Sequence, residues 1–104
     1  MVLSMSDQLA CRRIHITGIV QGVGFRPFVY NLALRYGLRG WVLNSSAGVD
    51  IEAEGTPTAL DAFILAVEAE KPPLAVIDSL SVEEIQLNGY TQFTTSESQS
   101  APGD

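Results

Sequence analysis

Apolar and polar residues follow two alternating periods along this chain. Residues 13–17 alternate polar and apolar, which is the two-residue period of a half-buried strand. From Phe25 to Tyr36 the apolar residues instead recur every three or four positions, as on one face of an amphipathic helix. Strand-like runs return at 40–44 and 49–54, and a short turn that ends in glycine joins them as a predicted hairpin.

A second helix is predicted to follow the hairpin. Thr56 is a suitable N-cap, and Pro57 suits the first helical position. Apolar residues at helical spacing continue to Val67, and the Lys-Pro-Pro segment at 71–73 should end this helix. Strand character returns at 76–85, with a short final strand predicted at 92–95.

The order of these elements predicts a ferredoxin-like β-α-β-β-α-β sandwich, an α+β fold with an antiparallel sheet and two helices on one face. Residues 11–95 form the predicted domain. Residues 1–10 are predicted to be a flexible N-terminus, and residues 96–104 a flexible tail or linker, because neither segment has a period. The carboxylates of the 49–54 strand alternate with apolar residues, so we expect their face of the sheet to be solvent-exposed: Asp50, Glu52 and Glu54.

Composition limits the class of protein. The 104 residues are 46% apolar, which suits one globular domain, and no apolar run approaches the ~20 residues that span a bilayer. The first residues also lack the basic and apolar regions of a secretory signal. The only cysteine, Cys11, allows no internal disulfide, and together with the only histidine, His15, it cannot build a zinc site. We therefore expect a cytoplasmic protein with no metal and no membrane partner.

Charge is distributed unevenly along the chain. Residues 1–43 contain five arginines and one aspartate, a net charge of +4, whereas residues 44–104 contain eleven carboxylates and one lysine, a net charge of −10. The total of −6 disfavours nucleic-acid binding, which depends on clustered positive charge. Arginines in the first part could still hold a small anion.

The connection from the first strand to the first helix is the main candidate binding site. Its three glycines, Gly18, Gly22 and Gly24, let backbone N–H groups converge just before a helix N-terminus, and this combination can cradle an anion. A tight turn with a surface arginine would explain the same residues equally well. The candidate phosphate-binding loop consists of Gln21, Gly22, Val23, Gly24, Phe25 and Arg26.

Two nucleotide-binding motifs do not match this loop. It has no lysine for a Walker motif, and Pro27 stands where the dinucleotide fingerprint requires its third glycine.

Asn44, at the end of the 40–44 strand, is the second candidate. Its amide can donate to and accept from a water molecule, so it can orient a nucleophile without changing charge. Asparagine also begins hairpins through its own local hydrogen bonds, which is the structural alternative. The predicted order lets the glycine loop and Asn44 approach each other at one end of the sheet.

Other residues are weaker candidates. Cys11 has no general base nearby in the sequence, which disfavours a catalytic thiol. His15 is predicted to lie on the polar face of its strand without an acid–base partner, and Trp41 is expected to serve packing.

Two motifs occur together in this chain: Gly18-x-Val20-Gln21-Gly22-Val23-x-Phe25-Arg26 and Gly40-Trp41-Val42-x-Asn44, the second followed by the turn at Gly48. Together they resemble the acylphosphatase family, and the resemblance covers residues 12–95. It implies a ferredoxin-like fold, hydrolysis of carboxyl-phosphate mixed anhydrides, and no cofactor. It also implies that Arg26 binds the phosphoryl group together with the loop amides and that Asn44 orients the attacking water.

Three further local features narrow the resemblance: Pro27-Phe28-Val29-Tyr30, Pro72-Pro73-Leu74-Ala75-x-Ile77-Asp78 and the 93–98 segment. They resemble the N-terminal domain of HypF-type carbamoyltransferases, which mature nickel–iron hydrogenases. This narrower resemblance implies hydrolysis of carbamoyl phosphate to carbamate for cyanide-ligand synthesis, with the downstream domains of the same polypeptide and hydrogenase maturation proteins as partners. A stand-alone acylphosphatase and a non-catalytic module that binds an anion or a partner remain the alternatives.

Overall fold

The computed structural model describes residues 8–96, so most of the two predicted flexible ends, 1–10 and 96–104, lies outside the described residues. Ala10 and Ser96, which the sequence assigns to those ends, belong to the first and last strands. The predicted order of elements and the short final strand are confirmed. The elements are β1 (Ala10–Ile19), α1 (Phe25–Arg35), β2 (Arg39–Ser45), β3 (Gly48–Gly55), α2 (Pro57–Ala69), β4 (Val76–Ile85) and β5 (Phe93–Ser96).

The five strands form one sheet in the order β4-β1-β3-β2-β5. The pairings β4–β1, β1–β3 and β3–β2 are antiparallel, as predicted for a ferredoxin-like fold. The pairing of β2 with β5 is parallel, so the sheet is mixed. This difference has a topological cause. Residues 86–92 carry the chain from one edge of the sheet to the other, so β5 runs opposite to β4 and therefore in the direction of β2.

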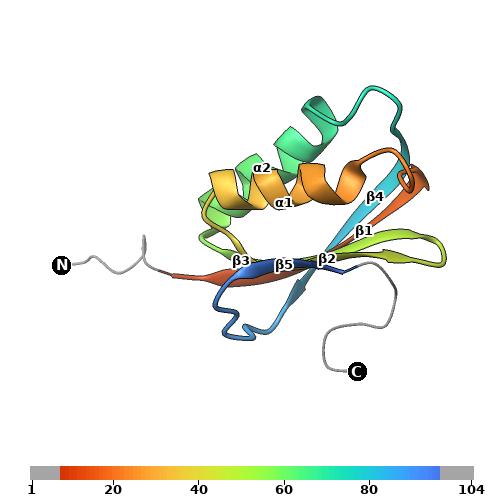
Figure 1. Cartoon of the computed structure of the whole chain (residues 1–104). Coiled ribbons are helices and arrows are strands. Elements are labelled where there is room, and N and C mark those ends of the chain that lie inside the picture. Colours follow the sequence, from red (N-terminus) through yellow and green to blue (C-terminus); the bar gives the residue numbers. More distant parts are fainter. Residues whose placement is uncertain (1–7, 97–104) are drawn as a thin grey trace.

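Both helices cover the same face of the sheet, and the apolar core lies between the two layers (Figure 1). The predicted stripe of α1 supplies Phe25, Val29, Leu32 and Ala33 to this core. The helix ends at Arg35, and the φ of 69° at Gly37, just after the cap, allows the N–H of Leu38 to donate to the carbonyl of Ala33 at 2.8 Å. The start of α2 is also as predicted, with the Thr56 hydroxyl accepting from the N–H of Ala59 at 3.2 Å.

The prediction that the carboxylates of β3 face solvent is wrong for two of the three. Glu54 is 1% exposed and Glu52 is 7% exposed, because residues 86–92 cross the helix-free face of the sheet above them. Glu54 accepts backbone N–H groups from Asn88 at 2.7 Å, Gly89 at 3.3 Å and Tyr90 at 2.9 Å. A carboxylate can be buried at this position because hydrogen bonds replace its water.

Glu52 belongs to a polar network on the same face. It accepts from the hydroxyl of Tyr90 and from a guanidinium N–H of Arg13 at 3.0 Å. Trp41, predicted to serve packing, is buried here and donates its indole N–H to the Tyr90 hydroxyl at 2.9 Å. Burial, followed by the neighbouring Glu52 carboxylate, raises the pKa of Tyr90 to about 12. The network holds residues 86–92 against β2 and β3, immediately before β5 begins.

We predict that Glu54→Ala lowers the free energy of unfolding by about 2–4 kcal/mol, because the backbone donors of residues 88–90 lose a buried charged acceptor. Urea denaturation checks this value. Glu83→Ala, at an exposed position of β4, is the matched control and should stay within about 0.5 kcal/mol of wild type. Equal effects of the two substitutions would contradict the role of the Glu54 carboxylate.

Candidate active site

The glycine loop and the β2–β3 hairpin meet at one end of the sheet (Figure 1). The side-chain amide of Gln21 donates to the carbonyl of Ser45 at 2.6 Å and to the carbonyl of Gly48 at 2.8 Å. Because Ser45 directly follows Asn44, these two bonds hold the loop beside the strand that carries Asn44. The loop and the hairpin thus approach each other as the β-α-β-β order predicts.

Two glycines of the loop have a left-handed backbone conformation. Gly22 and Gly24 have φ values of 75° and 79°, a region that only glycine enters at little cost. No atom of the described residues, apart from adjacent chain, lies within 4 Å of the position that a Cβ would take at either glycine, so the space beside both is open. Gly24 is the N-cap of α1, and the first turn of this helix has no acidic side chain to offset its positive end.

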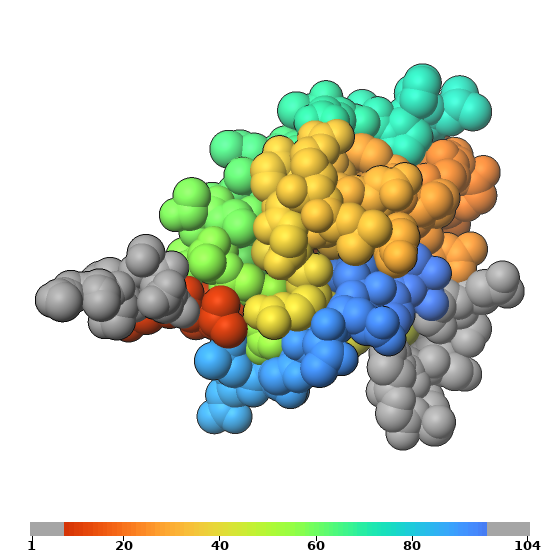
Figure 2. All heavy atoms as spheres, turned by 60° about the vertical axis from the view of Figure 1, so that its left-hand side comes forward, coloured from red at the N-terminus to blue at the C-terminus, as the bar shows by residue number. Residues whose placement is uncertain are grey.

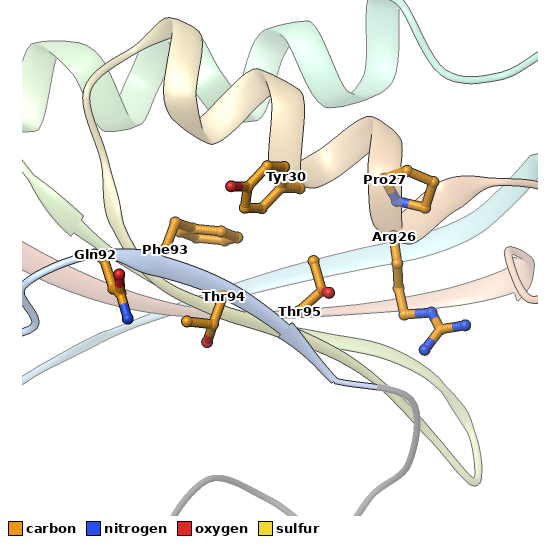
Figure 3. Close-up of a pocket in the computed structure, with 7 residues that line it drawn as sticks. All are labelled: Arg26, Pro27, Tyr30, Gln92, Phe93, Thr94 and Thr95. Atoms are coloured by element: carbon orange, nitrogen blue, oxygen red, sulfur yellow. The ribbon is translucent and has the colours of Figure 1, made fainter.

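Arg26 and Asn44 lie on the same side of the sheet. Side chains alternate along β2, and Val42 is buried in the core beneath the helices, so Asn44 also points to the helix-covered face. Arg26 is in the first turn of α1, which covers this face, and its side chain extends from the helix toward the sheet (Figure 3). Both candidate catalytic residues are partly buried.

A groove of about 590 Å³ lies between the first turns of α1 and strand β5 (Figure 3). Arg26 lines one part of it, and the packed rings of Tyr30 and Phe93, with centroids 6.3 Å apart, line another. Thr95 points from β5 toward the helix, whereas Thr94 points away from it. Sequence reasoning missed this groove, since nothing in the periodicity indicates that β5 pairs with β2.

The other two candidates, Cys11 and His15, belong to β1 and point to the helix-free face of the sheet. Cys11 is fully buried, and burial raises the pKa of its thiol to about 11, which agrees with the prediction that it is not a nucleophile. His15 does have a partner, contrary to prediction, because Asp50 lies opposite it in the β1–β3 register and its carboxylate bonds Nδ1 of the ring. Within residues 8–96 no three His, Cys, Asp or Glu side chains gather as a metal site would require.

The sheet order and the paired helices define a ferredoxin-like α+β domain, in which the glycine loop leads into a helix N-terminus. The chain belongs to the acylphosphatase family, whose family model matches residues 12–95. It is 45% identical over 93 residues to the carbamoyltransferase HypF2 of Cupriavidus necator, covering 86% of this chain and 12% of that protein. It is 47% identical over 83 residues to an acylphosphatase of Thermotoga maritima, covering 79% of this chain and 91% of the relative.

Solved structures show the same two kinds of relative. Full-length HypF in a phosphate- and nucleotide-bound form superposes with a TM-score of 0.85 at 43% identity, over 89% of this chain and 13% of that one. The acylphosphatase of Bacillus subtilis superposes with a TM-score of 0.78 at 40% identity, over 86% of this chain and 99% of the other. The chain therefore spans about an eighth of the length of its HypF relatives and nearly all of a small acylphosphatase. No helix in residues 8–96 has the length and apolar character to span a membrane.

Gln21→Ala should weaken the binding of inorganic phosphate, because the loop loses both hydrogen bonds to the hairpin. The free energy of unfolding should fall by only about 1–2 kcal/mol, as expected for two partly exposed bonds. Isothermal titration with phosphate and urea denaturation measure the two effects. Gln86→Ala, an exposed glutamine just after β4, serves as the control. Unchanged phosphate binding in the folded Gln21→Ala protein would show that these two hydrogen bonds do not determine the shape of the glycine loop.

Cys11 should react slowly with a thiol reagent near pH 8 in the folded protein, because burial both blocks access and keeps the thiol protonated. In denaturant, where the pKa returns to its usual range, reaction should be faster by orders of magnitude. Absorbance from a disulfide reagent follows both rates. Rapid labelling of the native protein would contradict the buried position of this thiol.

Proposed function

We propose that this domain hydrolyses acyl phosphates at the end of the sheet where the glycine loop meets the hairpin. The observation that supports the proposal is the pair of Gln21 hydrogen bonds to the hairpin, at 2.6 and 2.8 Å, which hold the glycine loop near the strand that carries Asn44. Membership in the acylphosphatase family supports the same reaction class.

The phosphoryl group of the substrate binds in the cradle. Backbone N–H groups between Gln21 and Arg26 donate to its oxygens, the positive end of α1 favours its negative charge, and the guanidinium of Arg26 adds a rigid pair of donors. These donors also stabilise the charge on the phosphoryl oxygens as the acyl–oxygen leaving group departs. Arg26 therefore contributes to binding and to the transition state.

Asn44 positions the nucleophile. Its amide holds a water molecule in line with the bond from phosphorus to the leaving oxygen, which is an effect of orientation. A new P–O bond forms to the water oxygen, the bond to the carboxylate oxygen breaks, and a phosphoryl oxygen takes the water proton. The products are inorganic phosphate and the free carboxylate or carbamate.

The finer proposal is that the substrate is carbamoyl phosphate and that this chain is the N-terminal part of a cytoplasmic HypF-type carbamoyltransferase. In that setting carbamate passes to a downstream ATP-using domain for cyanide-ligand synthesis, with hydrogenase maturation proteins as partners. Identity of 45% to a HypF protein over 86% of this chain supports this reading. The similar identity to a small acylphosphatase along 91% of its length favours the second candidate, a stand-alone acylphosphatase.

Arg26→Ala should lower kcat/KM for benzoyl phosphate and carbamoyl phosphate by about 100-fold or more and should weaken phosphate inhibition. Asn44→Ala should lower kcat by a similar factor but leave phosphate inhibition nearly unchanged, because the amide acts on the water. Phosphate release measures both. Arg35→Ala and Asn31→Ala, at exposed positions of α1, are the matched controls.

Each outcome distinguishes among the candidate functions. A loss of only a few-fold in Arg26→Ala would contradict the mechanism. Preference for carbamoyl phosphate supports the carbamoyltransferase domain, whereas efficient hydrolysis of both substrates supports a stand-alone acylphosphatase. Phosphate binding without turnover in the folded protein would indicate a non-catalytic binding module.

A further inference from the structure

Strand β4 forms one edge of the sheet, and its outer side pairs with no other strand of residues 8–96. It runs for ten residues, whereas β5, the strand at the opposite edge, has four. The backbone N–H and C=O groups of β4 that point away from β1 are therefore open to a further strand. Addition of an extended segment to such an edge is a common mode of peptide recognition.

The helix layer does not cover this edge. Val82 lies opposite Ile14 in the β1–β4 register, so both side chains point to the helix-covered face of the sheet. Ile14 is buried in the core, whereas Val82 is 43% exposed. A strand added to β4 would therefore bury apolar surface as well as backbone groups.

Helix α2 borders the same edge. Arg12 donates to Glu84 of β4 at 2.5 Å and to Asp61 of α2 at 2.7 Å, so the Asp61 side of α2 faces β4. Leu65 lies one turn after Asp61 on that side and is 67% exposed. The segment from α2 into β4, turquoise in Figure 2, lies at the margin of the molecule, and its Leu74 is exposed as well. The edge thus carries several apolar side chains that the fold leaves exposed.

The charged side chains of β4 are all negative. Asp78, Glu83 and Glu84 are exposed, and the strand contains no lysine or arginine. Cross-strand neighbours of opposite charge stabilise a sheet, and like charges directly opposite each other destabilise it. A segment that pairs with β4 should therefore carry positive charge.

The arginines of β1 do not neutralise this edge. Arg12 lies between its two carboxylate partners, and only 13% of its side chain is exposed. Arg13 is opposite Glu83 in the register, but its guanidinium donates to Glu52 of β3 at 3.0 Å, away from the edge. The carboxylates of β4 therefore determine the charge that an added strand would meet.

Charge disfavours two other occupants of the edge. If two copies of β4 paired with each other, three carboxylates from each copy would lie along one contact and repel at neutral pH. Residues 1–7 and 97–104 of this chain contain three carboxylates and no lysine or arginine, so they are not complementary to β4 either. A basic segment of another protein fits the edge better than both.

We propose that the β4 edge is a docking site for an extended segment of a partner protein in which basic and apolar residues alternate. Val82 and Glu83 point to opposite faces of the sheet, so a segment with this alternation places apolar side chains beside Val82 and basic side chains beside Glu83. Backbone hydrogen bonds to β4 hold the segment in place. The inference is independent of the proposed hydrolysis, because the groove beside Arg26 lies at the opposite edge of the sheet.

The test titrates the protein with a synthetic peptide as long as β4 that alternates lysine with valine and threonine. The control peptide has glutamate in place of every lysine. Fluorescence anisotropy should show that the lysine peptide binds at least about tenfold more tightly than the control, and added salt should weaken its binding. Hydrogen exchange measured by NMR should slow at the β4 amides that point away from β1.

A charge reversal on β4 tests the position of the peptide. Glu83→Lys places a like charge beside the basic residues and should lower the affinity for the lysine peptide at least about fivefold. Asn31→Lys, at an exposed position of α1, also adds positive charge but lies away from β4, so it should change the affinity less than about twofold. Thermal unfolding confirms that both variants are folded.

Each other result overturns the proposal. Equal binding of the two peptides, or binding without protection of the β4 amides, would show that this edge does not select a basic strand. Binding of neither peptide would leave the carboxylates with the sole effect of preventing edge-to-edge association. A dimer of the wild-type protein at neutral pH that protects the same amides would identify a second copy as the occupant.

Discussion

The contact that assembles the candidate site is the double hydrogen bond from the side chain of Gln21 to the carbonyls of Ser45 and Gly48. It joins a loop after the first strand to a hairpin more than twenty residues later in the chain. Backbone carbonyls at a hairpin turn need partners, and a glutamine amide supplies two donors at once. The contact holds the glycine loop beside the end of the strand that carries Asn44.

A second polar contact has the same effect at the other end of the sheet. Glu54 accepts three consecutive backbone N–H groups and holds residues 88–90 against the helix-free face. The chain then reaches the far edge of the sheet, where β5 pairs with β2 and forms one wall of the groove. Without that crossing the groove beside Arg26 would lack its strand wall.

The sequence predicts the order of the helices and strands because each element has its own local hydrophobic period. Alternation at 13–17 and helical spacing from Phe25 reflect which side chains an element buries, and a sequence displays this directly. The Thr56 cap of α2 and the glycine turn at Gly37 that follows α1 are local features as well. The same reasoning failed at Glu52 and Glu54, because a polar strand face can be covered by a segment that follows much later in the chain.

For the candidate site, the sequence by itself determined which residues to consider: a glycine loop, an arginine at a helix start and an asparagine at a strand end, in the pattern of the acylphosphatase family. These features are local or carried by motif, so no contact between distant residues is needed to see them. Only the tertiary structure decided that Gln21 ties the loop to the hairpin, that Asp50 faces His15, and that Tyr30 and Thr95 share a groove with Arg26. The physical reason is that register and strand order bring together residues far apart in the chain, and neither has a local signal.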